Sequence, residues 1–188
     1  MSVPDPGPPP KRTYHVHDGF YLRMSAGVAY GAANVNADGN FYPDYDVNGV
    51  GLSLDAMVGG SPSTGLALGG GLTVSGYGQD GAGGFLLAGV FVDGFPDPVN
   101  GWHLGGLLGF AGVTSSGNGS EPDFSGGGFG LSAWLGHDFW VADEWSMGPL
   151  LRFNGAIARD ASRDDDAQPT TLSNATFEGT LSFSVLYH

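Results

Sequence analysis

The sequence lacks cysteine altogether and has a single lysine, Lys11. The absence of cysteine excludes a disulfide framework, a cysteine-based metal site and a lipid anchor on cysteine. Charged residues make up 13% of the chain, whereas the surface of a soluble domain usually carries about a quarter or more. The chain therefore cannot cover itself with mixed charge as an ordinary soluble domain does.

Long apolar runs are also missing, so no segment reaches the length of about 20 residues that a membrane-spanning helix needs. Residues 1–12, "MSVPDPGPPPKR", have no apolar central region of the kind found in signal peptides. If the protein is exported, we expect this to be a processed chain behind an added Met, with its signal peptide removed. Residues 1–18 are rich in Pro and then polar, which predicts a linker or extended arm.

The net charge of −13 argues against nucleic acid as a partner. Disorder is excluded by the apolar content, since hydrophobic residues make up 41% and aromatic residues 12% of the chain. A length of 188 residues suits one domain.

Apolar and polar residues alternate with a period of two from Gly19 to the end of the chain, which is typical of β-strands. Gly, Asn, Asp and Pro separate the alternating segments. The segments are residues 20–31, 47–59, 65–77, 84–95, 102–114, 127–140, 147–158 and 171–188. Both faces of 84–95 are apolar, so its facing stays undetermined. This pattern predicts an all-β domain over residues 19–188.

The connections between these segments differ in length. Short turns such as "GSPST" and "PDPVN" join some pairs, and long polar loops join others. Short turns at one end and long loops at the other are typical of an up-and-down antiparallel outer-membrane barrel. An even number of strands places both termini at the short-turn end.

The two faces of the strands differ in side-chain size. One face carries large apolar residues, and the other carries mostly Gly, Ala, Ser and Thr. Small polar residues suit the narrow lumen of an eight-stranded barrel, and the large apolar ones suit lipid. A soluble lipocalin-like ligand-binding barrel is the alternative, and it requires the large apolar residues to point inward.

The eight segments, and a last strand that alternates in "TLSFSVLY", resemble the small OmpA/OmpX-type outer-membrane barrels over residues 19–188. In that family the chain usually ends on the aromatic residue, whereas here His188 follows Tyr187. The resemblance implies an eight-stranded up-and-down antiparallel transmembrane β-barrel in the outer membrane of a Gram-negative envelope. It also implies contact with the lipid bilayer and lipopolysaccharide, and folding by the barrel-assembly machinery, for which the last strand is the signal.

Four charged residues lie within the strands and share the small-residue face: Arg23, Asp55, Arg152 and Glu178. If the last strand pairs with the first, their signs alternate around neighbouring strands. We therefore predict a lumenal ion-pair network in the order Arg152–Glu178–Arg23–Asp55. Such a network would plug the lumen and satisfy its buried charges. The functional alternative is a gate or a selectivity ring.

Aromatic residues gather towards the short-turn end. We predict that an aromatic girdle lies there, where rings sit at the level of the lipid headgroups. Its members are Phe20, Trp102, Trp140, Trp145 and Tyr187.

Other candidate sites are weak. Residues 34–40, "NVNADGN", resemble the start of a calcium loop, but Tyr45 stands where a bidentate Glu is needed. His15 and His17 form an H-x-H pair that lacks obvious further ligands. No G-x-S-x-G or other catalytic motif is present. We expect no enzymatic activity, no catalytic residues, no cofactor and no metal.

The predicted role is structural, adhesive or interactive, through acidic surface loops such as residues 159–168. The Pro-rich arm, predicted to be periplasmic, could join the barrel to another envelope protein in an assembly. A narrow pore for ions or small solutes is the transport alternative.

Overall fold

The computed structural model describes residues 15–38, 44–117, 123–160 and 171–188. The elements of these residues are all strands. They are β1 (Phe20–Asp38), β2 (Tyr45–Ser63), β3 (Leu66–Gly94), β4 (Trp102–Ser116), β5 (Phe124–His137), β6 (Phe139–Ala142), β7 (Trp145–Arg159) and β8 (Thr171–Tyr187). The Pro-rich part of the arm, most of the acidic loop 159–168 and the end of the calcium-like segment 34–40 lie outside the described residues.

β3 is a long hairpin that supplies two strands of the barrel. Its first arm pairs with β2 up to Asp80, and its second arm pairs with β4 from Ala82. The chain reverses at Gly81, whose φ of 95° is readily available only to glycine. The connection between segments 65–77 and 84–95 is therefore a tight turn between strands that extend almost to it.

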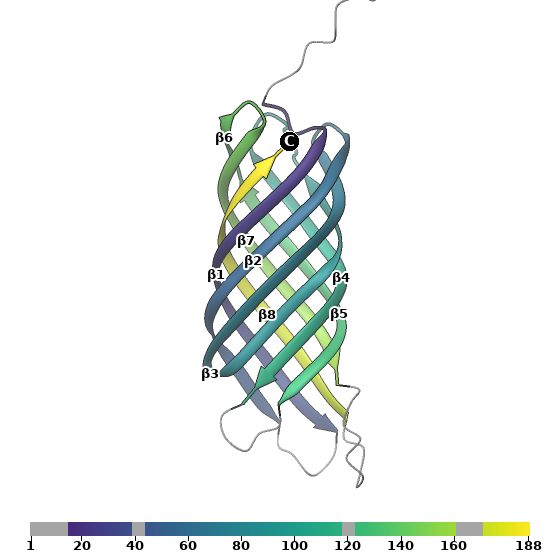
Figure 1. The fold of residues 1–188 in the computed structure, drawn as a ribbon, viewed down its shortest axis with the longest axis vertical. Coiled ribbons are helices and arrows are strands. Elements are labelled where there is room, and N and C mark those ends of the chain that lie inside the picture. Colours follow the sequence, from purple (N-terminus) through teal and green to yellow (C-terminus); the bar gives the residue numbers. More distant parts are fainter. Residues whose placement is uncertain (1–14, 39–43, 118–122, 161–170) are drawn as a thin grey trace, which may run out of the picture.

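The sheet closes on itself as an up-and-down antiparallel barrel (Figure 1). The strand order is β5-β4-β3-β2-β1-β8-β7-β6, and a further pairing between β5 and β7 closes the ring. β6 continues the line of β5 past Asp138, so the barrel has eight strands once β3 is counted twice. The first strand pairs with the last along 17 residue pairs, from Leu22↔Tyr187 to Asp38↔Thr171.

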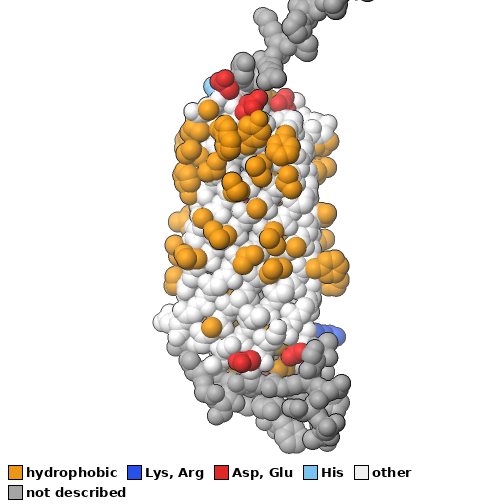
Figure 2. All heavy atoms as spheres, in the orientation of Figure 1, with side chains coloured by type: hydrophobic (Ala, Val, Ile, Leu, Met, Phe, Trp, Pro, Cys, Tyr) orange, Lys and Arg blue, Asp and Glu red, His pale blue; other side chains and the backbone are white. Residues whose placement is uncertain are grey.

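The large apolar residues point out of the barrel and the small ones point in. Leu52 and Phe110 on the outer wall are 70% and 71% exposed. Figure 2 shows hydrophobic side chains spread over the wall, with acidic side chains near its two ends. On the second arm of β3, Val90 points outward while Leu87 and Phe91 are buried inside, which determines the facing that the sequence pattern left open.

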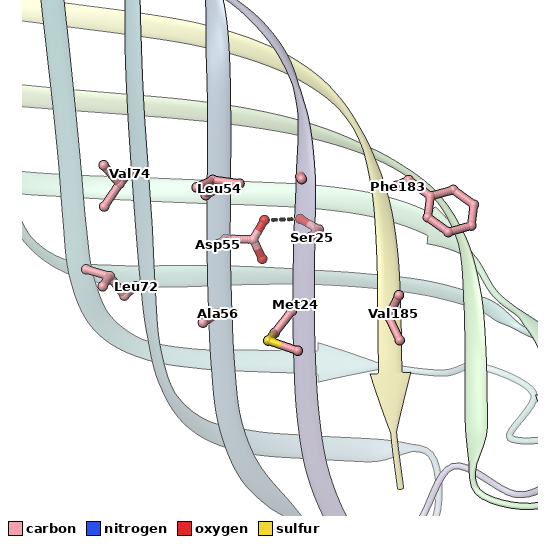
Figure 3. Close-up of a pocket in the computed structure, with 10 residues that line it drawn as sticks. Met24, Ser25, Leu54, Asp55, Ala56, Leu72, Val74, Phe183 and Val185 are labelled. Atoms are coloured by element: carbon pink, nitrogen blue, oxygen red, sulfur yellow. Dashed lines mark hydrogen bonds between the residues drawn. The ribbon is translucent and has the colours of Figure 1, made fainter.

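This facing excludes the lipocalin-like alternative, because a soluble barrel buries its large apolar residues. Part of the outer wall is hollowed into an apolar groove over β1, β2, the first arm of β3 and β8 (Figure 3). Small Ala26 and Ala56 lie among larger Met24, Leu54 and Phe183. An outer wall of this composition is suited to contact with the hydrocarbon chains of lipids.

Candidate functional site in the barrel lumen

Asp93, near the end of the second arm of β3, is the hub of the lumenal polar network. Its carboxylate accepts hydrogen bonds from Tyr21 Oη at 2.6 Å, Arg23 Nη1 at 2.9 Å and Trp134 Nε1 at 3.0 Å. His103 Nδ1 lies 3.1 Å from both carboxylate oxygens. All five side chains are buried, so the carboxylate gains from its neighbours the hydrogen bonds that it would make with water.

Trp134 lies in the lumen beside both arginines. The guanidinium carbon of Arg23 is 4.3 Å from the centre of the indole ring, and that of Arg152 is 5.4 Å away. Both distances are within the range of cation–π attraction. Gly105, the partner of Trp134 on β4, provides the room, because a Cβ at Gly105 would lie 2.5 Å from the ring. We call Arg23, Trp134 and Arg152 the cationic stack.

Asp55 neutralises the second arginine of the cationic stack. Its Oδ1 lies 2.8 Å from Arg152 Nη2 and 4.0 Å from Arg23 Nε. Ser25, on the neighbouring strand β1, donates a hydrogen bond to the other carboxylate oxygen (Figure 3). Arg152 also donates to Thr73 Oγ1 at 2.8 Å. Arg23 and Arg152 are thus each paired with an aspartate, and the charges of the stack balance.

We predicted that Glu178 lies between the two arginines, and this is wrong. It accepts hydrogen bonds from Asn154 Nδ2 at 2.8 Å, Thr180 Oγ1 at 3.1 Å and Ser75 Oγ, and all three of these partners are neutral. The cause is the height of each residue along its strand. Arg23 faces Leu186 on β8, eight residues beyond Glu178, which is roughly 26 Å at about 3.3 Å per residue.

The lumen beyond Glu178, towards the long-loop end, is filled mainly by apolar side chains, among which Thr176, Asn174 and Ser115 are joined by hydrogen bonds. Tyr77 lies there between two glycines: a Cβ at Gly31 or at Gly83 would come within 2.3 Å of its ring. Further along are buried side chains from five strands: Val35, Val47, Val113, Phe124 and Leu172. The filling therefore changes from charged to mainly apolar along the barrel axis.

The short-turn end of the lumen is covered by the last residues of the arm. His17 stacks on Phe95 with the ring centres 3.8 Å apart, and its Nδ1 lies 2.6 Å from Nε2 of His188. Its backbone N–H donates to Pro98 O at 3.1 Å, and its C=O accepts from Gly65 N at 2.9 Å. The sequence pattern predicted a linker or extended arm over residues 1–18, and residues 15–18 of it pack against the barrel end.

Four of the predicted girdle residues line the outside of this end. Phe20, Trp102 and Trp145 are 51%, 53% and 40% exposed. The ring of Tyr187 lies 6.1 Å from Phe20 and 5.0 Å from Trp145. The exception is Trp140.

Trp140 is half-buried, and it packs against the arm. Its ring lies 4.7 Å from that of His17 and 5.3 Å from those of His15 and His188. It contributes to the covering of the mouth, a role that strand periodicity does not reveal because its partners lie on the arm and at the C-terminus.

The described residues contain no group of three His, Asp or Glu side chains arranged to hold a metal ion. Among the same residues, no helix is long and apolar enough to cross a membrane. Many of the buried polar groups of the lumen form hydrogen bonds with one another.

No protein-family model matches this chain, and no curated protein matches it. Several solved structures are similar to it. Neisserial surface protein A is similar with a TM-score of 0.55 and 15% identity, covering 90% of this chain and 96% of its own. The outer membrane protein OprG of Pseudomonas aeruginosa has a TM-score of 0.52 and 12% identity, with 94% and 100% covered.

The outer membrane protein AlkL, solved in lipid bilayers, has a TM-score of 0.53 and 13% identity, with 98% and 97% covered. At such identities the likeness shows the fold. The chain is an eight-stranded barrel of the small outer-membrane type. This fold and the apolar outer wall place the protein in a bacterial outer membrane, in contact with its lipid bilayer.

Proposed function

We propose that this protein is a closed outer-membrane barrel that acts through its exposed end and does not conduct ions or solutes. The observation that carries the proposal is the cationic stack, in which the buried Trp134 packs against two buried arginines, each neutralised by an aspartate. The apolar filling further along adds a second barrier. A gate would need side chains that can leave the path, whereas Arg23 and Arg152 are each held by an aspartate.

The long-loop end is the part that would meet other molecules. Its loops are acidic and rich in Gly, Ser and Asp, a composition suited to polar, reversible contacts. We propose a structural or adhesive role for them, together with contact between their carboxylates and lipopolysaccharide through divalent cations. The absence of a catalytic motif in the sequence supports a role without enzymatic activity.

Two further partners belong to this proposal. The alternating last strand resembles the signal that the barrel-assembly machinery reads, and Tyr187 lies on its outer face as that role requires. The Pro-rich residues 1–14 would lie on the periplasmic side, where they could reach another envelope protein.

Intact cells provide the test. Loop residues 160–168 would be replaced by Gly and Ser, and cell aggregation and surface adhesion would be compared with those of cells carrying the unaltered protein. Heat-modifiable migration in gels would verify that both barrels fold. We expect the replacement to abolish the surface phenotype while the barrel stays folded. A phenotype that persists unchanged without the acidic loop would contradict this role for the loop.

A further inference from the structure

Residues 16–18 are held over the periplasmic mouth by backbone hydrogen bonds on both sides. His17 binds the β3–β4 turn through Pro98 O and the β2–β3 turn through Gly65 N. Gly19 O accepts from Ser61 N at 2.7 Å. The segment thus lies over the end of the barrel and links two of its turns.

The His17 side chain is buried in a seat made by three rings. It stacks on Phe95, lies against Trp140 and forms a hydrogen bond with His188 at the C-terminus. A hydrogen bond between two imidazole nitrogens needs a lone pair on one of them, so at least one ring must be neutral. The second nitrogens, His17 Nε2 and His188 Nδ1, are buried without a hydrogen-bond partner.

The groups that face this pair come from each strand packed around it. β4 contributes His103, and the second arm of β3 contributes Asp93. β1 contributes Tyr21, whose ring lies 6.2 Å from that of His188. Asp138, before β6, lies near His103, with 3.7 Å between Oδ2 and Nε2.

The side chains of the β6–β7 turn lie at the rim, and its backbone binds the two termini. Asp143 O accepts from His15 N at 3.5 Å, and Glu144 O accepts from His188 N at 3.0 Å. Asp93 is the carboxylate that favours the charged form of both histidines, but it already receives hydrogen bonds from three other side chains.

We propose that His17 and His188 form an acid-released latch, which holds the arm over the periplasmic mouth at neutral pH and frees it when the two rings are protonated. Protonation would put two positive charges on rings whose nitrogens are 2.6 Å apart, in a seat made largely of aromatic carbon. Release would free the residues before Gly19 and leave the cationic stack in place, so the latch controls the arm and not the lumen.

The direction of the pH dependence follows from the pKa values of the seated rings. Burial, with His188 and His103 nearby, lowers the pKa of His17 to about 2. Burial likewise lowers the pKa of His188 to about 4, against the opposing effect of Asp93. A free imidazole has a pKa of about 6.5, so the undocked arm binds more protons. Docking is therefore fully favoured above about pH 6.5 and is lost progressively as the pH falls below it.

Hydrogen exchange at the Gly65 amide reports the docked state, because that N–H is bonded to His17 O. The refolded barrel would be studied by NMR in lipid nanodiscs at about pH 7.5 and about pH 5, with protection expressed relative to the intrinsic rate at each pH. Each histidine that gains a proton on release shifts the equilibrium by about 30-fold at pH 5. We expect protection of Gly65 at the higher pH and at least a 10-fold loss at the lower.

Three variants make the result specific. His17→Phe keeps a ring on Phe95 but cannot be protonated, so its acid-induced loss of Gly65 protection should be about 30-fold smaller than that of the unaltered chain and should come from His188 alone. His17→Ala should give weak protection at both. His15→Gln, at the exposed position two residues earlier, should behave as the unaltered chain. Equal protection of the unaltered chain at the two pH values, or an acid-induced loss in His17→Phe as large as that of the unaltered chain, would overturn the latch.

Discussion

Asp93 shows how one carboxylate can organise a buried polar network. It accepts from a phenol, a guanidinium and an indole, and an imidazole nitrogen lies beside it. Arg23 is fully buried, and a buried guanidinium is tolerated only when it is paired and hydrogen-bonded. Sequence reasoning found Arg23 but not Asp93 as its partner, because both faces of segment 84–95 are apolar and its inward parity could not be determined.

Replacing Asp93 should therefore be costly. In Asp93→Asn, Arg23 loses its nearest anion, and we expect the free energy of unfolding to fall by about 3–5 kcal/mol. Urea unfolding of the barrel in lipid vesicles measures this quantity. Asp143→Asn, in the exposed β6–β7 turn, is the matched control and should change it by less than about 0.5 kcal/mol. A loss no larger than that of the control would show that Asp93 does not hold the network.

At the scale of strands, the alternating pattern predicted their number, their order around the barrel and which face meets lipid. The pattern could not predict the position of each residue along the barrel axis. The order of strands β7, β8, β1 and β2 is as expected, yet Glu178 and Arg23 lie far apart along the axis. Stagger depends on the register of all eight strands together, and no local pattern reports it.

Glycines on the inner face leave room for aromatic rings that come from other strands. Trp134 lies over Gly105 on β4 and not in a space left by Gly130 and Gly136 of its own strand, and Tyr77 lies between Gly31 and Gly83. A sequence shows that such glycines line the lumen, but which ring each one receives depends on the closed barrel.

The packing of Tyr77 gives a test at this scale. Gly31→Ala would place a Cβ 2.3 Å from the ring, and such overpacking should cost about 1–3 kcal/mol in the free energy of unfolding. The same substitution made in a Tyr77→Ala background should cost less, because the ring is gone. Gly155→Ala, whose Cβ would have no neighbour closer than 3.7 Å, is the control. Equal costs of Gly31→Ala in both backgrounds would contradict the proposed contact.

The whole molecule is a cylinder that reverses the layout of a soluble protein, with apolar side chains outside and charges inside. In the described residues, the filling runs from the His17 seat through Asp93 and the cationic stack to the apolar layer around Phe124. We propose that these layers close the lumen. The start of β1 and the C-terminus lie at the same end of the barrel as the short turns (Figure 1), and we propose that the arm and the acidic loops act on opposite sides of the membrane.

Ion conductance of the single barrel tests the central claim, that the lumen is closed, most directly. The refolded protein would be recorded in planar lipid bilayers, with heat-modifiable migration verifying its fold. The unaltered chain should give no current above that of the bare bilayer. The variant that combines Arg23→Ala, Trp134→Ala and Arg152→Ala removes the cationic stack and should conduct more than the unaltered chain. Discrete, lasting conductance steps from the unaltered chain, unchanged in that variant, would contradict a closed lumen.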